Sequence, residues 1–192
     1  SISNTDEDIF EIAKARIIKT RAFSRILNLY LHKRSIDARN KNDIKLVCTV
    51  CAEVDGTRAS EEKLAKFGIK VLSNETLSFE YAGEPLIAPP LVVGFGPAGM
   101  FCALALARAG LKPIVIERGA DVDTRVARVN SFYKTKVLDT ETNIQFGAGG
   151  AGTFSDGKLT TGIKDPLCRH CLDELVKHGA PEDILYNAKP HI

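Results

Sequence analysis

A glycine-rich turn between an apolar strand and an alanine-rich helix is the feature that most constrains the fold of this 192-residue chain. The turn reads Gly94-Phe95-Gly96-Pro97-Ala98-Gly99 and directly follows the apolar residues Leu91-Val92-Val93. After the helical run, Pro113-Ile114-Val115-Ile116 has the composition of a second strand and ends in Glu117. Strand, glycine turn, helix and strand in this order predict one βαβ unit with parallel strands, in a protein of the α/β class.

Each residue type in the turn has a physical reason to be there if the turn binds a pyrophosphate. Gly94 permits a tight turn, Gly96 lets the main chain approach the phosphates, and Gly99 lets the helix pack closely on the strand. Pro97 suits the first helical turn, where its missing N–H costs little. Together with Ala98, these residues place backbone N–H groups at a helix N-terminus, which favours an anion.

Glu117 lies about 20 residues after the turn, where a carboxylate accepts hydrogen bonds from a ribose hydroxyl. The same negative charge repels a 2′-phosphate, so the motif disfavours NADP. The alternative is a glycine-rich turn in an unrelated α/β domain. The glycines alone do not separate FAD from NAD.

A second glycine-dense segment, Asn143–Leu159, extends the pattern with the sequence NIQFGAGGAGTFSDGKL. With this segment, the glycine turn and Glu117-Arg118-Gly119, the chain resembles the uncharacterised bacterial FAD-dependent dehydrogenases, whose flavin domain is of the glutathione-reductase type. The resemblance also covers residues 33–39 and 188–192. It implies FAD as the cofactor, a Rossmann-like FAD-binding region and oxidoreductase chemistry on an unassigned substrate.

The resemblance places the loop of residues 146–158 beside the flavin. It implies main-chain contacts to the cofactor from a short run: Gly149, Gly150, Ala151, Gly152 and Thr153. We expect Arg118 and Arg125 near the phosphates, with a solvated or structurally paired arginine as the alternative for each. Ser155–Lys158 also fits a hairpin turn, because Asp-Gly is a strong turn pair. The family has an acidic residue where this chain has Ala148, so the resemblance gives no electrostatic role at that point.

Members of this family continue beyond the position at which this chain ends. We therefore expect the chain to supply the ADP-binding part of a flavin site, which leaves open whether it is an enzyme by itself. The alternatives are a non-catalytic dinucleotide-binding fragment, or an interaction or nucleic-acid-binding N-terminal module on a flavoprotein. No general acid or base stands out, and His170, His178 and His191 receive no catalytic role.

A stretch containing glycine and proline, residues 82–90, separates two predicted domains, a small α+β domain (1–86) and the N-terminal part of an FAD-binding domain (87–192). The first domain is compatible with a ferredoxin-like arrangement lacking its first strand. Its first predicted element is a helix with a capping box at Thr5 and Asp8 and with Ile9, Ile12, Ala13 and Ile17 on one face. A strand with Leu27, Leu29 and Leu31 follows, and then a strand over 44–54, a helix over 60–67 and a strand over 69–72. In the second domain we expect a helix over 121–133 and a final helix with Asp165 as its cap, Pro166 at its first position and Gly179 past its end.

Composition limits the classes of binding partner that the sequence predicts. The net charge of +2 gives no global reason to expect nucleic acid, and the basic stretch from Lys14 to Lys45 contains few aromatic residues. No apolar run approaches the roughly 20 residues of a membrane helix, and no signal peptide precedes the first helix, so we expect a cytoplasmic protein with no membrane partner. The sequence indicates no oligomeric state.

The five cysteines fit a reducing compartment and do not form a disulfide scaffold. Cys48 and Cys51 would face opposite sides of a strand, so they do not suit one metal. Cys168 and Cys171 would share a helix face with leucines, and burial is the expected role, with a redox or metal site as the alternative. We predict no metal site.

Overall fold

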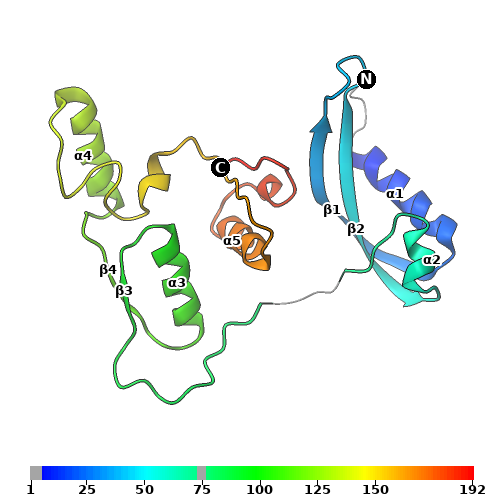
Figure 1. Cartoon of the computed structure of the whole chain (residues 1–192), viewed down its shortest axis with the longest axis horizontal. Coiled ribbons are helices and arrows are strands. Elements are labelled where there is room, and N and C mark those ends of the chain that lie inside the picture. Colours follow the sequence, from blue (N-terminus) through cyan, green and yellow to red (C-terminus); the bar gives the residue numbers. More distant parts are fainter. Residues whose placement is uncertain (1–5, 73–76) are drawn as a thin grey trace. The chain divides into compact units, whose positions relative to one another are not determined.

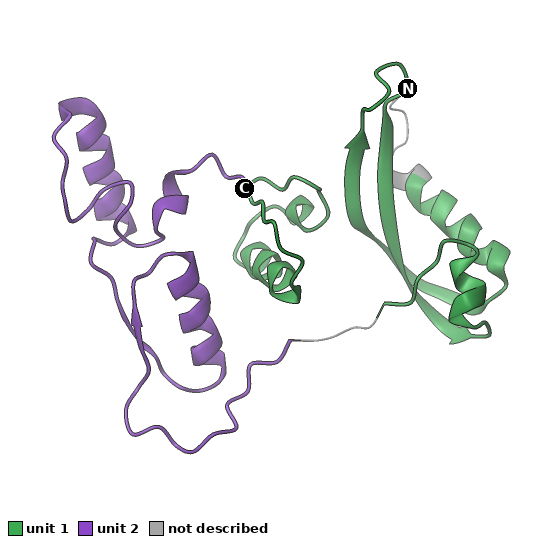
Figure 2. Cartoon of the chain, in the orientation of Figure 1, with its two compact units in different colours: residues 1–76, 159–192 green, residues 77–158 purple. Residues whose placement is uncertain are grey.

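The computed structural model describes residues 6–72 and 77–192, with side chains from residue 9 onward. The chain forms two compact units, one made of residues 1–76 and 159–192 and the other of residues 77–158 (Figures 1 and 2). Residues 159–192 thus group with the N-terminal residues. The predicted domain boundary between residues 86 and 87 stays a prediction.

A long antiparallel hairpin dominates the first unit. Strand β1 (Phe23–Asp37) pairs with β2 (Lys45–Thr57), with Tyr30 opposite Cys51. The register shifts on β1 between Ile26 and Asn28, which is the signature of a β-bulge. Leu29 and Leu31 are half-buried as predicted, but Leu27 lies at the bulge and is 52% exposed.

Strand β2 shows the predicted alternation. Even-numbered residues from Ile44 to Val54 are half-buried, and the odd-numbered residues between them are exposed except for the buried Cys51. Cys48 and Cys51 therefore lie on opposite faces of the strand, as their spacing predicts.

Helix α1 (Asp6–Thr20) packs against both strands of the hairpin. Ile9, Ala13 and Ile17 are half-buried at intervals of four residues, but Ile12 is 54% exposed and does not belong to this face. The predicted capping box falls on Thr5 and on the side chain of Asp8, which lie outside the described part of the chain.

The short helix α2 (Glu61–Ala65) begins at Ser60, whose side chain accepts a hydrogen bond from the Lys63 N–H. It buries Leu64. The strand predicted over residues 69–72 is wrong. Gly68 turns the chain with a φ of +70°, and Ile69 bonds back to the Leu64 carbonyl, so this apolar run ends a helix and pairs with no described strand. Without that strand, the described residues of this unit hold a two-stranded sheet and do not form the ferredoxin-like arrangement.

Helix α5 (Pro166–Lys177) has the predicted ends. The Asp165 side chain accepts from the Leu167 N–H at 2.8 Å, Pro166 opens the helix, and Gly179 follows it with a φ of +101°. After the 3₁₀ turn η2 (Glu182–Leu185), the chain runs beside β1. The Arg34 N–H donates to the Tyr186 carbonyl at 2.6 Å, which ties this C-terminal segment to the hairpin.

The second unit contains the predicted βαβ unit. Strands β3 (Leu91–Val93) and β4 (Ile114–Ile116) pair in parallel, and α3 (Pro97–Arg108) connects them (Figure 1). Val92 is buried, whereas Leu91, Val93 and all of β4 are exposed. Helix α4 (Val122–Thr135), capped by Asp121 and close to the predicted bounds, and the 3₁₀ turn η1 (Ala151–Phe154) complete a mixed α/β architecture with small sheets.

Candidate functional site

The glycine turn joins the end of β3 to the start of α3. Gly94 takes a φ of +95°, and its N–H donates to the Ile116 carbonyl of β4 at 2.7 Å. Gly96 is the N-cap of α3 and Pro97 is its first residue. The N–H groups of the first helical turn, including those of Ala98 and Gly99, have no acceptor within a helix, so this end of α3 can receive an anion.

Gly99 has the packing role that the sequence predicts. A Cβ at this position would overlap the Gly94 carbonyl oxygen and would lie 3.6 Å from Cγ1 of Val92. Only a residue without a side chain lets α3 approach the turn and β3 this closely.

Gly96 has a neighbour that the sequence does not reveal. A Cβ built on Gly150 would lie 2.9 Å from Cα of Gly96 and 3.1 Å from Cδ of Pro97, and the Gly149 N–H donates to the Phe95 carbonyl at 2.8 Å. The glycine loop, which we define as residues 143–153, therefore lies on the glycine turn with main chain against main chain.

Glu117 holds the turn and the loop together. Its Oε2 accepts from the Phe95 N–H at 2.7 Å, and its Oε1 accepts from the N–H groups of Gly119 at 2.9 Å and Gly147 at 3.1 Å. These bonds, chiefly those from Gly119 and Phe95, hold the pKa of the Glu117 carboxyl below its ordinary value. The Arg118 N–H adds a fourth, weaker backbone bond to the carboxylate, so main-chain donors surround Glu117.

Gly119 and Gly147 were expected only as parts of longer motifs, and the structure brings them into contact. A Cβ on Gly119 would lie 2.5 Å from both the N and the Cα of Gly147. Nearby, the buried Thr142 accepts from the Ala120 N–H through Oγ1 at 3.1 Å. The glycines were visible in the motifs, but nothing in the sequence indicated that they contact each other.

Arg118 is exposed and structurally paired. Its Nε lies 2.8 Å from Oε2 of Glu141, its Nη2 donates to Oε1 of Glu141 at 3.0 Å, and its Cζ stands 4.5 Å from the centre of the Phe146 ring. Its approach to a phosphate stays a prediction, and the alternative of a paired arginine describes this structure.

Arg125 is buried completely and its guanidinium lies among carbonyl groups of the glycine loop. The predicted phosphate contact would require the side chain to leave these partners. The paired alternative therefore describes Arg125 as well.

The remaining predicted contact residues form η1. Ala151, Gly152 and Thr153 are exposed, and the Thr153 N–H donates to the Gly150 carbonyl at 3.3 Å. The segment after η1 turns at Gly157, which has a φ of +78°, but the described residues on its two sides do not form the paired strands of a hairpin. Contact of these residues with a cofactor stays a prediction.

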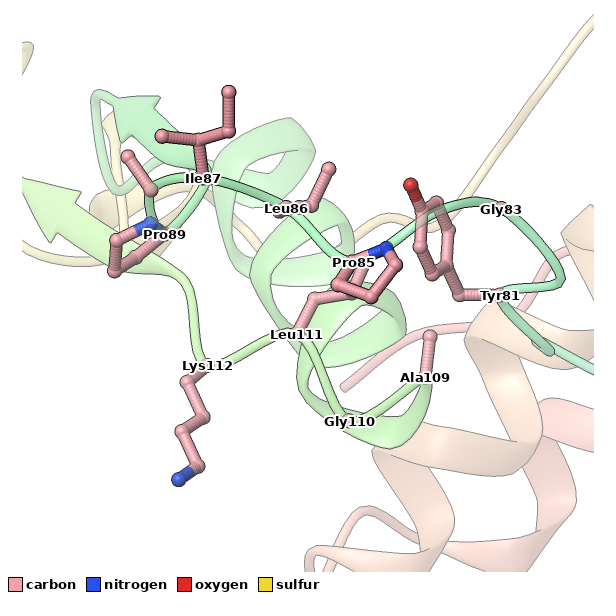
Figure 3. A pocket seen from close by; sticks show the side chains of 11 residues that line it. Tyr81, Gly83, Pro85, Leu86, Ile87, Pro89, Ala109, Gly110, Leu111 and Lys112 are labelled. Atoms are coloured by element: carbon pink, nitrogen blue, oxygen red, sulfur yellow. The ribbon is translucent and has the colours of Figure 1, made fainter.

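A shallow groove of about 490 Å³ lies at the opposite end of α3. It is lined by residues 109–112, which follow α3, and by a segment that contains Tyr81 and Pro85 (Figure 3). Helix α3 has 12 residues, so its two ends are about 18 Å apart and this groove is separate from the glycine turn. Lys112 points away from the segment of residues 81–89 in Figure 3, and the Tyr81 hydroxyl already donates to the Glu84 carbonyl. The lining of the groove is therefore mainly apolar.

Cys168 and Cys171 are half-buried on α5, and burial raises the pKa of the Cys171 thiol. Over residues 6–72 and 77–192, no group of three His, Cys, Asp or Glu side chains is arranged to hold a metal ion. Over the same ranges, every helix is too short or too polar to cross a membrane.

Comparison with known proteins bears on the segment that carries the glycine turn. Residues 90–131 match the family model of an FAD binding domain. FAD is the cofactor of this site. The match supports flavin binding of the kind found in FAD-dependent oxidoreductases. It covers the turn, α3, β4 and Glu117, but it ends before the glycine loop.

The chain is also similar to an uncharacterised protein of Clostridium beijerinckii. The two are 47% identical over 194 residues, which cover 97% of this chain and 36% of that protein. The chain thus spans about a third of the length of this relative.

Proposed function

We propose that this chain supplies the ADP-binding part of the flavin site of an FAD-dependent oxidoreductase, on a Rossmann-like unit of the glutathione-reductase type. The observation that carries the proposal is the junction of β3, the glycine turn and α3, with Glu117 at the end of β4, inside the segment that matches an FAD binding domain. The arrangement of a turn, a helix N-terminus and a carboxylate suits the pyrophosphate and the ribose of FAD.

The residues present fit this group. A Cβ at Gly94 would meet no atom within 4 Å, so the space beside the turn is open, and the first turn of α3 offers N–H groups to the pyrophosphate. The Glu117 carboxylate, at the end of β4, would accept a bond from a ribose hydroxyl. Bound FAD supplies hydride or electron transfer at its ring, and the protein supplies position and electrostatics.

The negative charge of Glu117 also determines whether the site accepts a 2′-phosphate on the ribose. With its pKa held low, the carboxylate is ionised at neutral pH and repels a phosphate on the ribose 2′-oxygen. We therefore expect ADP to bind more tightly than its 2′-phosphorylated form. The alternative of a non-catalytic or interaction module is not favoured by the match to an FAD binding domain.

The test is equilibrium dialysis of radiolabelled FAD against the purified chain, with unlabelled ADP and riboflavin as competitors. If the chain recognises the ADP part, ADP displaces FAD and riboflavin does not. Glu117→Gln removes a charged acceptor, which is worth about 1.5–3 kcal/mol, and should weaken FAD binding about 10- to 100-fold.

Glu141→Gln is the matched control, because Glu141 is an exposed carboxylate that pairs with Arg118 and not with the glycine turn. It should leave FAD affinity unchanged. Absence of FAD binding by the wild-type chain, or equal competition by riboflavin and ADP, would contradict the proposal.

A further inference from the structure

Arg125 is a buried cation whose side-chain hydrogen bonds are all with the glycine loop. From α4, its Nε donates to the Asn143 carbonyl at 3.0 Å and its Nη2 to the Ile144 carbonyl at 2.9 Å. Its Nη1 donates to three acceptors: the Ala148 carbonyl at 2.7 Å, the Gly147 carbonyl at 3.3 Å and Oγ1 of Thr153 at 3.4 Å. The Phe154 ring lies 4.9 Å from its Cζ.

This environment differs from that of an ordinary ion-paired arginine. Across the described chain, no carboxylate oxygen lies within 4.0 Å of the Arg125 guanidinium. Burial accordingly lowers the pKa of Arg125. One turn along the same helix, Arg128 is exposed and its Nε lies 3.7 Å from Oδ2 of Asp139.

The carbonyl bonds fix the orientation of two peptide planes. In a trans peptide, the N–H of a residue points away from the carbonyl of the residue before it. Because the carbonyls of Gly147 and Ala148 point to Arg125, the N–H groups of Ala148 and Gly149 point outward. They donate to the carbonyls of Ala120 at 3.1 Å and Phe95 at 2.8 Å, and Phe95 belongs to the glycine turn.

We infer that Arg125 is a positioning residue of the flavin site, which orients these two peptide planes and so holds the glycine loop on the glycine turn before the cofactor binds. The inference rests on the proposed function for its link to FAD. It also explains Gly147, because a Cβ there would lie 2.5 Å from Cδ of Arg125. A lysine has three donors on one nitrogen and cannot reach the same set of carbonyls.

The test compares Arg125→Lys with Arg128→Lys in the same chain. Hydrogen exchange of the unliganded proteins is measured at individual amides, together with thermal unfolding and FAD affinity. We expect the Ala148 and Gly149 amides of Arg125→Lys to exchange at least about tenfold faster while the α3 amides are unchanged, and FAD affinity to fall by about tenfold or more. Arg128→Lys should change neither quantity.

Two results of the exchange measurement would overturn the inference. One is unchanged exchange at Ala148 and Gly149 in a folded Arg125→Lys protein, and the other is a uniform rise across the unit, which indicates only a structural role. Faster loop exchange with unchanged FAD affinity would overturn the positioning role as well. If the Arg125 variant does not fold, Phe154→Leu removes the neighbouring ring and keeps the guanidinium, and it should show the same local pattern at smaller amplitude. No local change in Phe154→Leu would then count against the inference.

The two proposals fail in different ways. Failure of the wild-type chain to bind FAD contradicts the proposed function. The exchange rates at Ala148 and Gly149 are measured without FAD, and they decide the role of Arg125 in the loop.

Discussion

Gly150 stands where the glycine loop meets the glycine turn, and its replacement by alanine tests that contact. Its φ of +67° and ψ of −170° form a conformation that is essentially restricted to glycine and costs an L residue about 1–3 kcal/mol. The added Cβ would also lie 2.9 Å from Cα of Gly96, a contact with rigid main chain, and such overpacking costs about 1–3 kcal/mol. Keeping the loop docked would therefore cost about 2–6 kcal/mol.

The protein can reduce this cost by moving the loop away from the turn. That movement loses the Gly149 to Phe95 hydrogen bond, so we expect Gly150→Ala to lower the free energy of unfolding by about 2 kcal/mol. An equal loss in binding corresponds to about a 30-fold weaker FAD affinity.

Two other glycines separate the contributions. Gly152→Ala adds a Cβ that meets nothing within 4 Å, and the position has no positive φ. This substitution should therefore change the free energy of unfolding by no more than about 0.5 kcal/mol. Gly94→Ala has a φ of +95° and open space, so in urea unfolding without FAD it reports the backbone strain alone. Urea unfolding and FAD titration of the three variants are the measurements. If Gly150→Ala matches Gly152→Ala in both, the contact between the loop and the turn does not exist in solution.

Three further changes address other parts of the chain. Because the pKa of Glu117 is lower in the folded state than its ordinary value of 4.5, Glu117 stabilises the fold above that pH, and this contribution disappears as the pH falls through the lowered pKa. In urea unfolding, Glu117→Gln should therefore show a weaker loss of stability below about pH 4.5 than the wild-type chain. An identical pH profile for the two proteins would refute this. Asp165→Ala removes the N-cap of α5 and should cost about 1 kcal/mol of unfolding free energy, whereas Asp165→Ser should retain most of it; equal losses in the two variants would contradict the capping role. Asn187→Ala removes both the 3.1 Å bond from Nε of Arg34 and the 2.8 Å bond that its Nδ2 donates to Oδ2 of Asp183. It should cost about 1–2 kcal/mol of unfolding free energy and speed limited proteolysis of residues 186–192. Unchanged cleavage would show that the main-chain bonds alone hold this segment.

The sequence predicted those elements whose signals are local. The βαβ unit follows from two short apolar runs on either side of a glycine turn, and the ends of α5 follow from Asp165, Pro166 and Gly179. Each of these signals acts within a few residues of its own position. These signals could therefore be recognised without knowing which residues pack against each element.

Except at residues 69–72, where Ile69 bonds to the nearby Leu64, the failures depend on partners that are distant in the sequence. Leu27 is exposed because a bulge forms where β1 pairs with β2, and the run 69–72 is not a strand because Ile69 bonds back to α2. In the site, Glu117 and Arg125 were recognised as important, but the Gly147 donor to Glu117 and the acceptors of Arg125 lie in a loop whose path no spacing rule predicts. A glycine motif indicates that main chains meet closely, and only the folded chain shows which ones.

The bonds of Glu117 also have a consequence for how the unit folds. The bond from Phe95 spans 22 residues and the bond from Gly147 spans 30. A helical turn closes over four residues, and the entropy lost on closing a loop grows with its length. Non-local contacts of this kind slow folding, so amide protection at Gly147 should appear after protection in α3. During synthesis, Glu117 leaves the ribosome before Gly147 does. In that interval the Glu117 carboxylate lacks the hydrogen bond from the Gly147 N–H.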